Sequence, residues 1–204
     1  MTSRLTSAFE DCFEYDGTAF HLNMAFDNVL KVFELFDDDN FSEEEKFFIF
    51  FEMMVSNYND LGNKEIQELC ALYEFILNDF IGVAEKSDGE QQKIMDFQKD
   101  AGLIYASFLS EYDMDLYEQH GKLHWSKFRE LLTNLSDKTA FKKAIGYRVM
   151  KLPSAKDTSD EYRNHIIKMK QTYALEDELQ SIDDAFDALA HTFKANAKVV
   201  IDNG

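Results

Sequence analysis

The sequence predicts a mainly α-helical, bundle-like domain that begins with a small N-terminal β-hairpin and ends with a helical C-terminal extension. Of its 204 residues, 45% are hydrophobic, which is enough to bury a substantial core. One proline and eight glycines leave few of the chain breaks that a many-stranded fold needs. Hydrophobic residues recur at intervals of three and four along most of the chain, which is the spacing of one helix face.

The first expected element is the hairpin, in the stretch CFEYDGTAFHLN at residues 12–23. Asp16-Gly17 lies between two short runs in which apolar residues alternate, and this is the strongest short-range signal for a tight β-turn. Two strands alone are marginally stable in water, so we expect the hairpin to pack on the helices.

Two helices should follow, the first over residues 26–36. Ser42, with Glu45 three residues later, fits a capping box that begins the second helix. Because its FFIFFEMMV segment is apolar nearly all round, we expect this helix to be the buried centre of the fold.

A third helix is expected over residues 66–80, with Cys70 on it as a small buried residue. Cys12 and Cys70 are far apart and show no CxxC spacing, so two reduced thiols are expected. The polar residues 85–93 indicate a connection, and Asp96 should cap a fourth helix that reaches Tyr112.

The stretch KLHWSKFRELL at residues 122–132 indicates an amphipathic helix whose apolar face includes Trp125, and burial is the expected environment of this side chain. Ser136 is the expected cap of the next helix, which Pro153 should end. Two polar helices, near 160–172 and 175–197, should follow. We therefore expect a core domain at residues 1–153 and a separate helical portion at 154–204.

The net charge of -18 opposes binding to nucleic acid, but the charge is unevenly distributed. Residues 122–151 carry eight basic side chains and two acidic ones. These basic residues are either the solvated side of amphipathic helices or a surface for an acidic protein partner, which includes an acidic neighbour in a homo-oligomer. The candidate protein-binding residues are Lys127, Arg129, Lys142, Lys143 and Arg148.

No motif points to catalysis, a cofactor or a metal, and we expect the protein not to be an enzyme. The acidic run FDDDNFSEEEK departs from a calcium loop, because Phe48 stands where the closing carboxylate should be. His120 and His124 are four apart, but the glutamate of an HExxH motif is missing. No apolar run reaches the roughly eighteen residues that span a bilayer, and no signal peptide is evident, so we expect a cytosolic location and no membrane partner.

The order of several segments resembles a family of bacteriophage tail-cluster proteins, the gene-product-fifteen family of Gram-positive siphophages. The matching segments span most of residues 14–153; they are FEYDGTAFHLN, FDNVLKVFELFDDDNFSEEEK, DFQKDAGLIYASFLSEYDMDL, LHWSKFRELLTNL and FKKAIGYRVMKLP. The resemblance implies a tail assembly chaperone that keeps the tape-measure protein soluble in the bacterial host cytoplasm, with other tail proteins as further partners. It carries no catalytic residues.

Two alternatives stay open at this level. One is a structural tail component that is retained in the virion. The other is an acidic DNA mimic that inhibits a host enzyme, which the charge of -18 suggests and the basic segment argues against.

Overall fold

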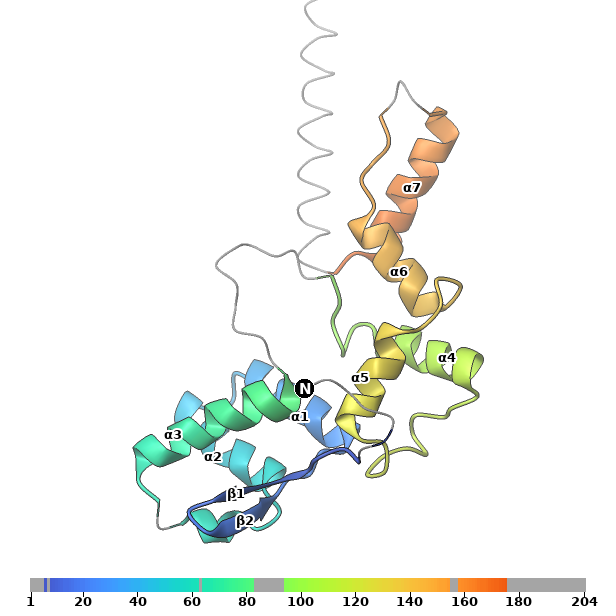
Figure 1. Cartoon of the computed structure of the whole chain (residues 1–204). Coiled ribbons are helices and arrows are strands. Elements are labelled where there is room, and N and C mark those ends of the chain that lie inside the picture. The colour runs from blue at the N-terminus through green and yellow to red at the C-terminus, as the bar shows by residue number, and fades with distance from the viewer. Residues whose placement is uncertain (1–5, 7, 63, 83–93, 155–157, 176–204) are drawn as a thin grey trace, which may run out of the picture. The chain divides into compact units, whose positions relative to one another are not determined.

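The computed structural model describes residues 6, 8–62, 64–82, 94–154 and 158–175 (Figure 1). These residues are mostly helical, with one two-stranded antiparallel sheet near the N-terminus, which confirms the predicted mainly α fold. They form two compact units: unit 1 is Met1–Glu90 with Asp113–Leu135, and unit 2 is Gln91–Tyr112 with Ser136–Gly204.

Unit 1 begins with the predicted hairpin of β1 (Cys12–Tyr15) and β2 (Thr18–His21). Tyr15 pairs with Thr18, and the two turn residues between them, Asp16 and Gly17, have φ values of 50° and 71°. Positive φ at both positions is the geometry of a type I′ turn, whose twist matches that of the strands. Phe20 on β2 is fully buried, so the hairpin packs on the helices as expected.

The helix α1 (Phe26–Asp37) is followed by α2 (Glu43–Met54). The capping box at the start of α2 is confirmed: the Ser42 N–H donates to the Glu45 carboxylate at 2.8 Å, and the Glu45 N–H donates to the Ser42 hydroxyl at 3.3 Å. The prediction that α2 is the buried centre of the fold is wrong for one side of the helix. Phe50 is buried but Phe48 is 46% exposed, because the core contacts only one side of the helix.

After the short 3₁₀ helix η1 (Tyr58–Leu61), α3 (Ile66–Phe75) continues into the π-helical turns of η2 (Ile76–Ile81). The third helix was predicted, but the π turns were not. Cys70 is exposed, which corrects the expectation that it is buried, since Leu72 and Ile76 supply the inward face instead.

The helix α5 (Trp125–Thr133) completes unit 1 and packs against α1, where the rings of Phe26 and Phe128 stack with centroids 4.9 Å apart. Trp125 is 3% exposed, so its predicted burial is confirmed. The backbone carbonyl of Ile81 accepts hydrogen bonds from Trp125 Nε1 at 2.9 Å and from the Arg129 guanidinium at 2.8 Å. These bonds fix the end of η2 to α5.

Unit 2 contains α4 (Ala101–Tyr112), α6 (Ala140–Val149) and α7 (Asp160–Tyr173), with α6 packed against both others. The cap of α6 is Thr139, whose hydroxyl accepts from the Lys142 N–H. Ser136 was the wrong choice, because its hydroxyl donates to Glu111 at 3.0 Å.

The interior of unit 2 holds an ion pair, Asp100 with Arg148, at 2.6 Å and with both side chains almost fully buried. Lys170 on α7 donates to the carbonyls of three residues at the end of α6, which are Tyr147, Arg148 and Met150. A cation at a helix C-terminus satisfies carbonyls that have no partner within the helix.

The predicted domain boundary at Pro153 falls inside unit 2, between α6 and α7. Residues 176–204 lie outside the described residues, and they include most of the last predicted helix. The separate C-terminal portion therefore stays a prediction. The predicted connection at 85–93 also lies outside the described residues.

Candidate protein-binding site

The candidate basic residues are divided between the two units. Lys127 and Arg129 lie on α5 of unit 1, and the other three lie on α6 of unit 2. The Arg129 guanidinium donates to Ile81 and lies 6.0 Å above the Trp125 ring. A binding role for Lys127, Arg129, Lys142 and Lys143 stays a prediction.

Arg148 has a role inside unit 2, because it is 5% exposed and its guanidinium contacts both carboxylate oxygens of Asp100. It also donates to the backbone carbonyls of Ile94 and Tyr173. An arginine that is buried and bound in this way is not available to a partner protein.

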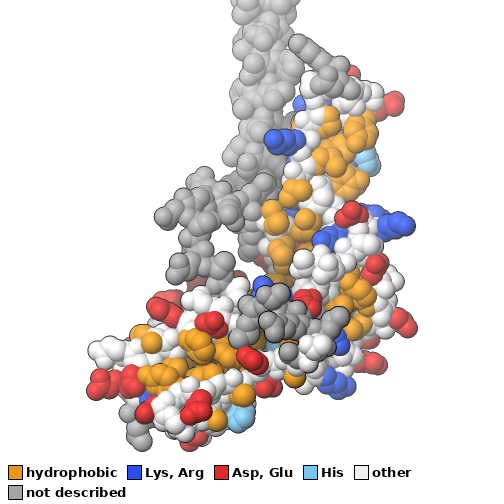
Figure 2. Space-filling view, in the orientation of Figure 1, with side chains coloured by type: hydrophobic (Ala, Val, Ile, Leu, Met, Phe, Trp, Pro, Cys, Tyr) orange, Lys and Arg blue, Asp and Glu red, His pale blue; other side chains and the backbone are white. Residues whose placement is uncertain are grey.

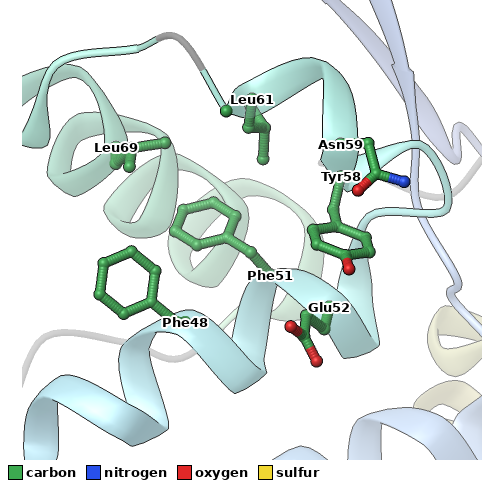
Figure 3. A pocket seen from close by; sticks show the side chains of 8 residues that line it. Phe48, Phe51, Glu52, Tyr58, Asn59, Leu61 and Leu69 are labelled. Atoms are coloured by element: carbon green, nitrogen blue, oxygen red, sulfur yellow. The ribbon is translucent and has the colours of Figure 1, made fainter.

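A pocket of about 220 Å³ lies in unit 1 between α2, η1 and α3 (Figure 3). Most of its lining is apolar, with aromatic rings contributed by α2 and η1. The lining residues are Phe48, Phe51, Glu52, Tyr58, Asn59, Leu61, Gly62 and Leu69.

The pocket has a buried floor and an exposed rim. Phe51 and Leu61 are 4% and 5% exposed, whereas Phe48 and Tyr58 on the rim are 46% and 39% exposed. Large apolar side chains that are exposed around a hollow are typical of a surface that binds another molecule.

The floor is held in place by a cluster of aromatic rings beneath it. Tyr73 on α3 contacts three phenylalanines of α2, and its ring centroid is 4.6 Å from that of Phe50 and 6.4 Å from that of Phe51. Burial raises the pKa of Tyr73, so its hydroxyl stays neutral at physiological pH. The cluster packs aromatic rings of α2 and α3 together next to the pocket.

The surroundings of the pocket are acidic. Residues 42–69 carry seven carboxylates and two lysines. Lys46 is buried and donates to the Phe36 carbonyl and to Glu43, and Lys64 pairs with Asp16 at 3.6 Å. Both lysines are thus occupied. Figure 2 shows hydrophobic side chains bordered by acidic ones on the visible face of unit 1.

Two carboxylates of α2 differ in their contacts. Glu52 lines the pocket and, among the described residues, forms no ion pair. Hydrogen bonds from the Ser42 backbone and side chain lower the pKa of Glu45 at the start of α2. The pocket therefore combines a mostly apolar lining with one carboxylate, that of Glu52, in an acidic segment of the chain.

The two histidines that were considered as metal ligands have other contacts. The Nδ1 atom of His124 accepts from the Ser126 N–H at 3.1 Å and caps α5, and the ring of His120 lies 5.7 Å from that of Phe26. Within the described ranges, no group of three His, Cys, Asp or Glu side chains is placed to hold a metal ion.

Residues 5–175 match the family described as Bacteriophage Gp15 protein. The chain belongs to this family. The resemblance seen in the sequence is confirmed, and membership of a phage family supports a structural or assembly role in a phage. No curated protein and no solved structure matches the chain.

The match to the Bacteriophage Gp15 protein family includes every residue that lines the pocket. Of the helices that the structure describes, none is both long and apolar enough to cross a bilayer. Sequence reasoning missed the pocket as a site. The exposed Phe48 belongs to a run of apolar residues that indicated burial, and only the packing of α2 shows which side is open.

Proposed function

We propose that the protein is a non-catalytic tail assembly chaperone that binds the tape-measure protein in the host cytoplasm while the tail is built. Membership of a phage family supports an assembly role. The observation that carries the proposal is the open apolar pocket on α2, η1 and α3, with Phe48 and Tyr58 exposed at its rim.

The pocket has the properties that a chaperone for a helical chain needs. A tape-measure protein is a long, largely helical chain with apolar stripes, and such stripes bind to apolar grooves through side chains at intervals of three and four residues. A preformed pocket binds these side chains without first being ordered, so less conformational entropy is lost.

The charge of the chain supports the same role. A net charge of -18 keeps a complex soluble, because the complexes repel one another. A partner whose apolar side chains are covered by so acidic a protein is less prone to aggregate.

Co-expression tests the proposal. The tape-measure protein of the same phage is produced in bacteria alone and together with this chain, and the soluble fraction is measured in each case. We expect the soluble tape-measure fraction to rise with the chain present, and the two proteins to elute together in size-exclusion chromatography. If the soluble fraction is unchanged and the proteins elute separately, the chaperone proposal is wrong.

Family membership also suits a structural tail component that stays in the virion. Mass spectrometry of purified virions separates the two roles. A chaperone that leaves after assembly is absent or present in trace amounts, whereas a structural component is found at a fixed ratio to the tube protein.

A further inference from the structure

We propose that the pocket binds one aromatic or large aliphatic side chain on a helical segment of the tape-measure protein, and that a Lys or Arg one helical turn away on that segment pairs with Glu52. This inference rests on the proposed function and specifies its partner segment. It follows from the size of the pocket, the spacing of two residues on α2 and the charge around them.

The size of the pocket limits what it can hold. At about 220 Å³ it is smaller than most small-molecule sites, which are about 300–1,000 Å³. Apolar cavities of about 150 Å³ are large enough for benzene. The pocket therefore suits a single ring or a branched aliphatic side chain of a partner protein, with Phe51 and Leu61 as its floor.

The spacing on α2 sets the position of the cation. Phe48 and Glu52 both line the pocket and are four residues apart on the same helix, so they lie about 6 Å apart along its axis, slightly more than one turn. A helix that lies along α2 matches this separation when its basic residue is three or four positions from its apolar anchor.

The charge around the pocket favours a basic partner. Glu52 is the acidic residue among those that line the pocket, and the segment that forms the pocket, residues 42–69, carries seven carboxylates and two lysines. The two lysines are already bound, to Glu43 and to Asp16. Opposite charges across an interface speed association and select against like-charged partners.

Charge disfavours two other occupants of the pocket. Residues 176–204 of this chain carry seven carboxylates and two lysines, so their charge has the same sign as that of residues 42–69. A second copy brings a net charge of -18 to an already acidic face. A basic segment of another protein is the partner that the electrostatics favour.

Peptide binding tests the inference. Overlapping peptides that cover the tape-measure protein, each long enough for several helical turns, are titrated with the full-length chain and followed by fluorescence anisotropy. The peptides that bind should contain an apolar anchor with Lys or Arg three or four residues away. Phe48→Asp should weaken their binding by at least about 30-fold, as expected for a central contact of an interface.

A charge swap tests the pairing. Glu52→Lys should weaken binding about fivefold at physiological salt, which is the effect of losing one exposed ion pair. Replacing the basic residue of the peptide with Glu should weaken binding to the wild type and restore binding to Glu52→Lys. Recovery in the double exchange is a result that a general loss of folding does not give.

Matched controls are available in the same unit. Phe41 is an exposed phenylalanine outside the pocket, and Glu74 is an exposed acidic residue on α3 outside the pocket. Phe41→Asp and Glu74→Lys should leave peptide binding unchanged. Circular dichroism and Trp125 fluorescence verify that each variant is folded.

The outcomes distinguish this inference from the proposed function. If peptides bind the wild type and the pocket variants equally well, the pocket is not the site, but the chaperone function stands. If neither the peptides nor the whole tape-measure protein binds the wild type, the proposed function itself fails. If Phe48→Asp converts an oligomer of this chain into monomers, a second copy occupies the pocket and the inference is overturned.

Discussion

Replacing Asp100 with Asn should destabilise unit 2 strongly, because it removes the negative partner of a buried arginine. Arg148 is 5% exposed and Asp100 is 1% exposed, and their closest atoms are 2.6 Å apart. Asn has nearly the size of Asp, so the substitution changes the charge without opening a cavity. Breaking a buried ion pair from one side costs about 3–5 kcal/mol, since the remaining charge is left without compensation.

The contacts of Arg148 place the expected loss within this range. Its guanidinium keeps the carbonyl of Ile94 at 3.0 Å and that of Tyr173, which are neutral acceptors and compensate the charge only in part. Asp100 also accepts from the Asp96 N–H at 3.0 Å, a bond that the Asn oxygen is able to keep. We therefore expect a loss of about 3 kcal/mol, the lower end of the range.

Urea denaturation followed by far-UV circular dichroism measures this loss, with Asp137→Asn as the control because Asp137 is exposed in the same unit. The double variant Asp100→Leu with Arg148→Met should be more stable than Asp100→Asn alone, since it leaves no buried charge. A loss below about 1 kcal/mol for Asp100→Asn, which is typical of an exposed pair, would refute the reasoning.

Three further predictions concern unit 1. Gly82→Ala should lower stability more than Gly121→Ala. Both glycines have positive φ, which strains alanine by about 1–2 kcal/mol, but only at Gly82 does the added Cβ lie 2.3 Å from the Arg129 guanidinium. Equal losses in urea denaturation would contradict this prediction. Trp125→Ala should lower the free energy of unfolding by about 3–5 kcal/mol, because it leaves a cavity where the buried ring was. A near-normal denaturation midpoint, measured by circular dichroism, would refute the structural role of Trp125. Burial lowers the pKa of His124 below its unfolded value of about 6.5, so the stability that neutral His124 contributes is present above that pH and is lost as the pH falls. Asn caps a helix without titrating, so the His124→Asn variant should lose less stability between pH 7 and 5 than the wild type. Parallel curves of stability against pH would contradict this prediction.

The parts of the fold that the sequence predicted well depend on neighbouring residues. The turn at Asp16-Gly17 requires only that two adjacent residues accept positive φ. The cap of α2 joins Ser42 to Glu45, three residues apart. Local chemistry of this kind is visible in any short stretch of sequence, so the hairpin and the helix starts were predictable.

The parts that escaped prediction depend on contacts between distant residues. Asp100 and Arg148 are 48 positions apart, and Arg148 alone was indistinguishable from the exposed basic residues near it. Ser136 was expected to cap α6, but its hydroxyl donates to Glu111, 25 positions away, and Thr139 is the cap.

The candidate site shows the same limit. An apolar run such as FFIFFEMMV indicates burial on every side, and its periodicity does not reveal which side the other helices leave uncovered. The exposure of Phe48 follows from the placement of η1 and α3 around α2, which sequence periodicity does not encode.

Site-specific photo-crosslinking from position 48 tests most directly whether the pocket on α2, η1 and α3 holds the tape-measure protein. A photoreactive phenylalanine analogue replaces Phe48 in cells that also produce the tape-measure protein, and position 41 carries the same analogue as a control. The account predicts a crosslink to a helical tape-measure segment from position 48 and none from position 41. Crosslinks from position 48 only to this chain itself, or equal yields from both positions, would contradict it.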